Sequence, residues 1–196
     1  MAASEPFSWL SCDSDYELPA DFKEAVTGLP EQEALRVWRF HGGPAVEQLF
    51  GWFGAVYFDP DYGSLPQIER TLIATVVSST NRCVACLTAH GHTLGELMGD
   101  HARAKRIGIN YRHAPLSARE RAIADYAVKL TKTPDEVDHA DVDALRAVGL
   151  SDQEIYQVAE ITAMFNFTNR IVSGVGLRVD DDFMAAIAPK NSTTGS

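Results

Sequence analysis

Residues 64–94 read SLPQIERTLIATVVSSTNRCVACLTAHGHTL, and this stretch decides the fold. Its first half is strongly apolar and begins near Pro66, a residue type that is favoured at the start of a helix. Its second half contains two cysteines three residues apart and a histidine four residues after the second. We therefore expect a buried helix from Pro66 to about Ser79, followed by a segment through Met98 that carries the cysteines.

The rest of the chain also predicts helices. Apolar periodicity predicts helices over 29–43 and 44–58, the second with an apolar stripe that includes Tyr57. Further helix starts are indicated by Pro134 after Thr133 and by the capping-box pairs Ser117/Glu120 and Ser151/Glu154. Period-2 alternation flanked by hairpin turns does not occur. We predict an all-α protein with an N-terminal arm over 1–28, a helical domain over 29–187 and a tail over 188–196.

The chain contains an internal similarity. TNRCVA at 80–85 and TNRIVS at 168–173 lie 88 residues apart, and Ile73 aligns with Ile161 in the same frame. Both copies follow an apolar helix, so the similarity predicts two related helical repeats. In this frame the two cysteines and the histidine align with residues of other chemistry, namely Ile171, Gly174 and Arg178. Only the first repeat therefore carries a candidate site.

Composition and charge exclude several classes of function. The formal net charge of −10 argues against nucleic acid and anionic membranes as partners, because both select basic surfaces. The longest apolar runs, such as LIATVV at 72–77, are too short to span a bilayer. The N-terminal residues lack the basic and apolar regions of a secretory signal, and three cysteines do not form a disulfide framework. We expect a reducing, cytoplasmic setting.

The cysteine segment has the geometry of a reversible dithiol. Residues three apart in a helix have Cα atoms about 5 Å apart, which a disulfide accepts. Asn81 is a favoured N-cap residue, and a helix that starts there places Cys83 in its first turn and Cys86 in its second. His90 follows Cys86 by four residues and so shares its helix face. The helix N-terminus and Arg82 would favour a thiolate.

Two other interpretations of the cysteines stay open at this point. Both can be small buried residues that only fill space in the core. A metal site would need a further ligand, which His92 or His101 could supply, but no second CxxC pair is present. We therefore expect no metal ion and no other cofactor. Cys12 lies in the N-terminal arm without a neighbouring partner, and we expect no role for it.

Residues 64–94 resemble the core of the alkylhydroperoxidase AhpD-like family, which includes the carboxymuconolactone decarboxylases. More narrowly, they resemble its peroxidase-related branch, whose later pattern is similar to DVDALRAVGLSDQEIYQVAEITAMFNFTNRI at 141–171. The resemblance covers about residues 30–182. It implies an AhpD-like all-α fold of two related helical repeats that assembles as a dimer, trimer or hexamer. It also implies a thiol peroxidase that acts on hydroperoxides and takes electrons from a dithiol partner protein.

The resemblance assigns roles to three residues. It implies that Cys86 attacks the peroxide, that Cys83 resolves the sulfenic acid as a disulfide, and that His90 belongs to the proton relay. The family has a relay glutamate twelve residues before the first cysteine, and Thr71 stands at that position here. Glu69 lies two residues earlier, about 200° around a helix, and is a poor replacement.

The missing glutamate keeps two alternative functions open. The first is an AhpD-like oligomeric protein without peroxidase activity, whose dithiol senses redox state. The second is an enzyme similar to the carboxymuconolactone decarboxylases, which act on a lactone acid without a CxxC dithiol. The second fits less well, because this chain has both thiols.

Overall fold

The structure is a computed structural model that describes residues 8–10, 43–179, 184–185 and 187. Within these residues the protein is all-α, with seven α-helices and no strand, which confirms the predicted fold class. The helix expected over 29–43 lies outside the described residues except for its last residue. The same holds for the tail over 188–196 and for all of the N-terminal arm except residues 8–10.

The helices follow one another through short links. In chain order they are α2 (Gly43–Phe53), α3 (Gln67–Thr80), α4 (Val84–Met98), α5 (His101–Asn110), α6 (Ala118–Lys132), α7 (His139–Ala147) and α8 (Asp152–Gly174). A π-helical turn, η2 (Gly54–Phe58), extends α2, and two 3-10 turns, η3 (Tyr111–His113) and η4 (Pro134–Glu136), precede α6 and α7.

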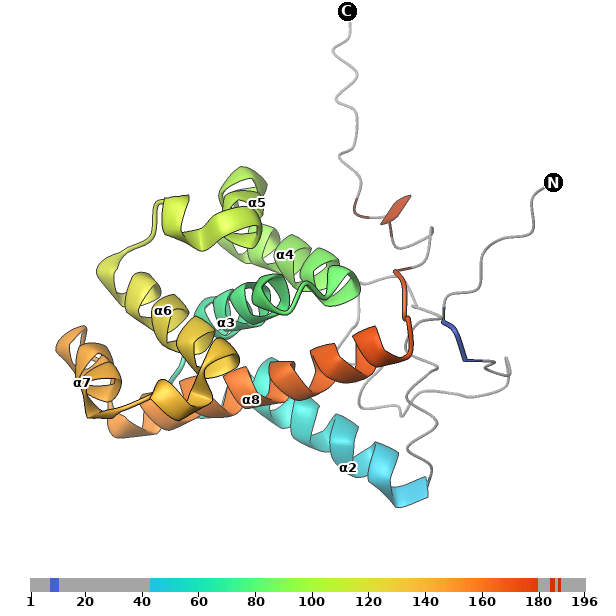
Figure 1. The fold of residues 1–196 in the computed structure, drawn as a ribbon, viewed down its shortest axis with the longest axis horizontal. Coiled ribbons are helices and arrows are strands. Elements are labelled where there is room, and N and C mark those ends of the chain that lie inside the picture. The colour runs from blue at the N-terminus through green and yellow to red at the C-terminus, as the bar shows by residue number, and fades with distance from the viewer. Residues whose placement is uncertain (1–7, 11–42, 180–183, 186, 188–196) are drawn as a thin grey trace, which may run out of the picture.

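Helix α3 forms the centre of the bundle, where it packs against α4, α6 and α8 (Figure 1). Every residue from 69 to 78 is buried, and Leu72, Ile73 and Val77 contribute to the main hydrophobic core. Burial of a side chain of this size stabilises a fold by roughly 1.5–3 kcal/mol. The helix predicted from Pro66 to Ser79 is confirmed within one residue at each end.

Both predicted capping boxes are present. The Ser117 hydroxyl accepts a hydrogen bond from the amide of Glu120, whose carboxylate accepts one from the Ser117 amide. Ser151 and Glu154 make the same reciprocal pair at the start of α8. These pairs satisfy amides at the helix start that have no partner within the helix.

The helix start predicted at Thr133 is wrong. Residues 134–136 form a single 3-10 turn, and α7 begins at His139. Asp138 is the N-cap of α7, and its carboxylate accepts a hydrogen bond from the Ala140 amide at 2.9 Å. Asp138 therefore satisfies the first amides of the helix, whereas the Thr133 hydroxyl makes no capping hydrogen bond.

The helix predicted over 44–58 is present, but its last turn is π-helical. The Asp59 amide donates to the Gly54 carbonyl at 2.9 Å, which is a hydrogen bond from residue i+5 to residue i. A π turn holds one residue more than an α turn, and such turns are frequent at functional sites. The turn includes Tyr57, which is 1% exposed and points into the core.

A buried arginine on α3 fixes the loop that follows this turn. Arg70 is 2% exposed, and its guanidinium donates to the carbonyls of Asp59 at 2.6 Å, Tyr62 at 2.6 Å and Leu65 at 2.7 Å. Hydrogen bonds from a charged donor are stronger than neutral ones. Arg70 therefore ties the loop, and with it the π turn, to the central helix.

Hydrogen bonds between α3 and α8 follow the predicted repeat. Asn169 and Asn166 lie 88 residues after Asn81 and Ser78. The Asn81 amide nitrogen donates to Asn166 at 3.0 Å, and the Asn169 amide nitrogen donates to Ser78 at 3.2 Å. The Asn81 amide also donates to Asn169 itself at 3.0 Å. Ser78 and Asn166 occupy equivalent positions in the two repeats. Asn81 and Asn169 therefore each bond to the same position in the opposite repeat, as expected for two repeats related by a local twofold axis.

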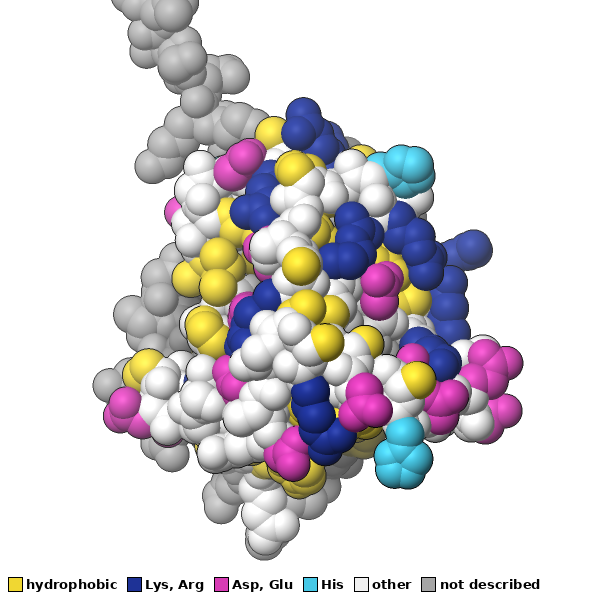
Figure 2. Space-filling view, turned by 90° about the vertical axis from the view of Figure 1, so that its left-hand side faces the viewer, with side chains coloured by type: hydrophobic (Ala, Val, Ile, Leu, Met, Phe, Trp, Pro, Cys, Tyr) yellow, Lys and Arg dark blue, Asp and Glu magenta, His cyan; other side chains and the backbone are white. Residues whose placement is uncertain are grey.

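The surface carries charges of both signs. On the face in Figure 2, Lys and Arg side chains gather over the upper part and Asp and Glu lie mostly below them. Among the described residues, no helix is both long and apolar enough to cross a membrane.

Candidate functional site

The site begins where the chain breaks between α3 and α4. Helix α3 ends at Thr80, and Asn81 is its C-cap rather than the N-cap of the next helix, which corrects the sequence-based expectation. The side chain of Asn81 is engaged by α8 and so does not cap α4. Cys83 is instead the N-cap of α4, and Cys86 lies in the first turn rather than the second.

Arg82 makes this break possible. Its backbone has a φ of +56°, in the left-handed region that residues other than glycine rarely adopt. The Arg82 amide donates to the Ser79 carbonyl at 3.1 Å, and the Cys83 amide donates to the Ser78 carbonyl at 3.0 Å. This pair of hydrogen bonds is a Schellman motif, which ends a helix and redirects the chain.

The break brings the two thiols together. The Sγ atoms of Cys83 and Cys86 are 2.8 Å apart and not bonded, against about 2.05 Å in a disulfide. Both cysteines are free and buried, with exposed fractions of 2% and 9%, whereas Val84 between them is 76% exposed. The start of α4 therefore lies at the surface with its thiols facing inward, and a disulfide can form with little movement.

The two thiols titrate as a pair. A hydrogen bond from the Cys86 thiol lowers the pKa of Cys83 to about 7, although burial opposes this shift. The same hydrogen bond and burial raise the pKa of Cys86. Two adjacent buried thiolates would repel each other, so the pair loses one proton readily and keeps the second. The first proton therefore leaves more readily than that of a free thiol, and the thiolate that forms lies on Cys83.

Helix α8 contributes two polar side chains to the thiols. Hydrogen bonds from Ser173 and Asn169 lower the pKa of Cys83 and of Cys86 respectively, although other contacts contribute more in each case. Sequence reasoning missed both residues. The repeat gave a signal for Asn169, because it aligns with Asn81, whereas no feature of the sequence pointed to Ser173.

His90 lies one turn after Cys86 on α4. Its ring packs edge-on against Tyr57 and Phe165, with ring centroids 5.3 Å and 4.7 Å away. Burial of the ring disfavours the imidazolium and lowers the pKa of His90 to about 4, so the histidine is neutral at pH 7. Among the described residues, no hydrogen bond joins this ring to either thiol.

A chain of hydroxyls leads from Gln67 to His90. The Thr71 hydroxyl donates to the Gln67 carbonyl at 2.9 Å and accepts from the Tyr57 hydroxyl at 3.3 Å. The Tyr57 oxygen is also 3.1 Å from His90 Nδ1, and either atom of this pair can donate. We infer that Tyr57 donates to Thr71 and accepts from His90 Nδ1, which leaves Nε2 free to accept a proton. Burial also raises the pKa of Tyr57, which stays a neutral phenol.

The three supporting residues named from the sequence have different surroundings. Thr71 has no exposed surface and contacts Tyr57 rather than a thiol. Glu69 forms an ion pair with Arg119 at 2.7 Å, which turns its carboxylate toward α6. The Arg82 side chain is exposed, and its observed contribution is the backbone turn. The residue beside His90 is Tyr57, which sequence analysis assigned only to an apolar helix face.

In the part of the chain that the structure describes, the thiols lie outside any cluster that could hold a metal ion. Among the described residues, the His, Cys, Asp and Glu side chains that lie close enough to share an ion are His92, Glu96 and His101, farther along α4 and at the start of α5. A metal site built on the CxxC pair therefore has no further ligand in the described part of the chain.

Fold and site together define an all-α protein of the AhpD-like fold with a CxxC pair at the start of a helix. The chain is similar to the uncharacterized peroxidase-related protein from Silicibacter sp. TM1040, with 29% identity over 95% of this chain and 99% of that one and a TM-score of 0.82. It is also similar to the AhpD-core peroxidase-related protein from Ralstonia eutropha JMP134, with 28% identity over 95% and 100% of the chains and a TM-score of 0.80. The resemblance stated from the sequence is confirmed.

A more distant likeness supports the fold alone. The debrominase Bmp8 has 17% identity over 85% of this chain and 86% of that one, with a TM-score of 0.69. No family model matches the sequence, and no curated protein matches it either.

Proposed function

We propose that the protein is a thiol peroxidase that reduces hydroperoxides through Cys83 and Cys86. The observation that carries the proposal is the 2.8 Å contact between two free thiols at the start of α4. Similarity to peroxidase-related AhpD-core proteins over nearly the whole chain supports the same reaction.

The reaction balances with the residues present. A thiolate sulfur attacks the terminal oxygen of the hydroperoxide, the O–O bond breaks, and the thiolate becomes a sulfenic acid. The leaving alkoxide takes the proton of the second thiol and departs as an alcohol. The second thiolate attacks the sulfenic sulfur and forms the disulfide, and the released hydroxide takes the proton that the thiol pair first gave to His90 and becomes water. The two cysteines together supply the two electrons.

In this proposal Cys86 attacks and Cys83 resolves, as the resemblance implies. The resting pair favours the thiolate on Cys83, because the Cys86 thiol donates to it. A shift of one proton across the 2.8 Å contact moves the thiolate to Cys86 without a change in net charge. Cys86 is also the more exposed of the two residues, at 9% against 2%.

His90 is the proton acceptor in this proposal, and Tyr57 and Thr71 are positioning residues. The hydroxyl chain keeps the His90 proton on Nδ1 and leaves Nε2 as a base. Neither hydroxyl can accept a proton near neutral pH, so the relay is weaker than one that ends in a carboxylate. General-base assistance is worth about 10²–10⁴ in rate, and we expect a modest peroxidase.

The proposal includes the partners expected from the sequence. A dithiol protein would reduce the disulfide by two thiol exchanges, at a surface that includes the exposed Val84. We also propose a homo-oligomer and a reducing compartment, the cytoplasm. Light scattering tests the assembly, and a mass near the 21.4 kDa of one chain would contradict it.

The direct test is peroxide consumption with dithiothreitol as the reductant. We expect turnover in the wild type and in the control Cys12→Ser, and none in Cys86→Ser. In the absence of dithiothreitol, which would itself reduce a sulfenic acid, Cys83→Ser should consume one equivalent of peroxide and stop at a sulfenic acid that dimedone traps on Cys86. Turnover in Cys86→Ser, or none in the wild type, would contradict the proposal. A trapped sulfenic acid on Cys83 in Cys86→Ser would reverse the two roles.

A redox-sensing dithiol is the second candidate. The specific observation in its favour is the relay, which ends in Thr71 and the Gln67 carbonyl rather than in a carboxylate. A sensor would form the Cys83–Cys86 disulfide with one equivalent of peroxide but would turn over no faster than dithiothreitol alone. The assay above separates the two functions.

A further inference from the structure

A second cluster of polar side chains lies where α4 meets α5. His92 and Glu96 are one turn apart on α4, and His101 is the first residue of α5. The turn at Gly99, which has a φ of +62°, and Asp100, the N-cap of α5, bring His101 back onto α4. One ligand atom from each of the three side chains lies within 4.8 Å of the others.

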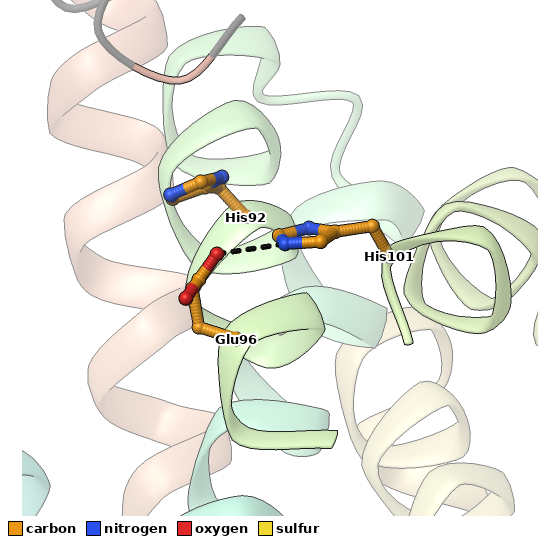
Figure 3. Close-up of side chains that lie close together, drawn as sticks. All are labelled: His92, Glu96 and His101. Atoms are coloured by element: carbon orange, nitrogen blue, oxygen red, sulfur yellow. Dashed lines mark hydrogen bonds and ion pairs between the residues drawn. The ribbon is translucent and has the colours of Figure 1, made fainter. Parts of the chain in front are cut away.

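The three side chains face one another (Figure 3). The Nε2 atom of His101 is 2.7 Å from Glu96 Oε1, and the rings of His92 and His101 stack with centroids 5.2 Å apart and planes 26° from parallel. His92 is partly buried, whereas Glu96 and His101 are exposed. The cluster is thus already gathered and open to ions from solvent.

Gly95 leaves the space that the His101 ring fills. A Cβ atom on residue 95 would lie 2.2 Å from His101 Nδ1 and 2.8 Å from its Cγ. Any side chain at this position would therefore displace the ring away from Glu96. Helix interiors disfavour glycine by about 1 kcal/mol relative to alanine. Gly95 therefore makes room for the His101 ring at some cost in helix stability.

We propose that His92, Glu96 and His101 form a binding site for a divalent transition-metal ion of the Zn²⁺ class. Two imidazole nitrogens and one carboxylate oxygen are a known zinc donor set, with water as the fourth ligand. Mg²⁺ and Ca²⁺ prefer sites made wholly of oxygen. Ligands at about 2.0–2.1 Å from a tetrahedral ion are roughly 3.3 Å apart. Small rotations of the three side chains bring their atoms from the observed separations to this value.

The site is separate from the dithiol. His92 lies about 200° around α4 from His90, so the two histidines face different sides of the helix. The sequence-based expectation of no metal considered His92 and His101 only as extra ligands for the thiols. The turn between α4 and α5 supplies a different set, in which Glu96 replaces the cysteines. The proposal does not depend on the peroxidase reaction.

Zinc titration by calorimetry tests the site. The titration uses a Cys83→Ser/Cys86→Ser background, because thiolates also bind zinc. We expect one ion per chain with a dissociation constant of micromolar order, and no binding of Mg²⁺ at the same concentrations. Removing one ligand, in His92→Ala or His101→Ala, should weaken binding by about tenfold or more. His113→Ala removes an exposed histidine on η3 and is the matched control, with unchanged affinity.

Gly95→Ala gives an independent check, because it keeps all three ligands and favours the helix. We expect it to weaken zinc binding by several-fold while thermal unfolding without zinc is unchanged or higher. Two results would overturn the proposal. One is the absence of stoichiometric binding in the background protein, and the other is equal affinity in the His92, His101 and His113 variants.

Discussion

The tripeptide Thr-Asn-Arg occurs twice in this protein with two different structures. At residues 80–82 it ends α3, and Arg82 turns the chain with a φ of +56°. At residues 168–170 it lies within α8, which continues without a break to Gly174. The same three residues therefore stop one helix and extend another, so local sequence does not decide where the helix ends.

The difference explains why one repeat carries the candidate chemistry. The break after residue 82 creates a new helix N-terminus, whose free amides and dipole favour a thiolate beside them. Helix α8 has no helix terminus at the equivalent position in the second repeat. It instead provides Ser173 and Asn169 as partners for the thiols. One repeat thus holds the thiols, and the other supports them.

The largest effect is expected when the dithiol is moved to the second repeat. Ile171→Cys/Gly174→Cys, in a Cys83→Ser/Cys86→Ser background, builds a CxxC pair in the last turn of α8. A Cβ at Gly174 meets no atom within 4 Å, so a side chain fits. The C-terminal end of a helix disfavours a thiolate, so we expect alkylation with a pKa at or above about 8.5.

Peroxide turnover of this variant should fall by about 10³-fold or more, since both the helix N-terminus and the relay are lost. The measurements are the pH profile of iodoacetamide labelling and peroxide consumption with dithiothreitol. Turnover near that of the wild type would show that the break is not needed for activity.

The proposed relay also differs between the repeats, because the second repeat has Ala159 and Arg178 where the first has Thr71 and His90. Tyr57→Phe removes the oxygen that accepts from His90 Nδ1, so the imidazole is free to change tautomer. Loss of a contact that orients a functional histidine typically lowers activity by about 10–100-fold, and we expect peroxide turnover to fall by that factor.

The matched control is Tyr62→Phe, which removes a hydroxyl that donates to Glu160 rather than to the relay. It should leave turnover unchanged. Equal effects of the two tyrosine substitutions would mean that Tyr57 acts only through packing.

Thr71 can be tested against a neighbour on the same helix. Thr71 and Thr75 are both fully buried, and their hydroxyls donate to the carbonyls one turn earlier at 2.9 Å and 2.8 Å. Without the Thr71 acceptor, Tyr57 donates to His90 Nδ1 and forces the His90 proton onto Nε2. We expect Thr71→Val to lower peroxide turnover about tenfold, which is the low end of the range for the loss of a positioning contact. Thr75→Val should leave turnover unchanged. Similar turnover in the two variants would exclude the tautomer argument.

The smallest expected effect concerns stability and has opposite signs in the two repeats. Glycine adopts a positive φ without the cost of about 1 kcal/mol that arginine bears, so Arg82→Gly should stabilise the protein by up to that amount. Arg170→Gly places glycine inside α8 and should destabilise it by about 1 kcal/mol. Urea unfolding midpoints measure both. A shift of the same sign in both variants would contradict the assigned backbone difference.

The sequence predicted what depends on nearby residues. Apolar periodicity located α3, and serine–glutamate spacing located the starts of α6 and α8. The spacing of Cys83 and Cys86 indicated their contact, because three residues make almost one helical turn. Their predicted roles in a reaction stay predictions.

The errors and omissions arise from distant contacts. Asparagine is a residue type that is favoured at N-caps. The partners of Asn81, however, are Asn166 and Asn169, which lie 85 and 88 residues away and hold it at the end of α3. Tyr57 belongs to the apolar stripe of its helix, which predicts only a packing role. The π turn and the contact with His90 reveal that its hydroxyl also positions the histidine. Sequence periodicity contains none of this information.

The break before α4 brings the two thiols together, and we propose that a hydroperoxide oxidises them to a disulfide. The direct measurement is a free-thiol titration before and after one equivalent of hydroperoxide, followed by peptide mapping and reduction with dithiothreitol. We expect the loss of two of the three thiols, a bond between Cys83 and Cys86, a free Cys12, and full recovery on reduction. No loss of thiols, or a bond that includes Cys12, would contradict it.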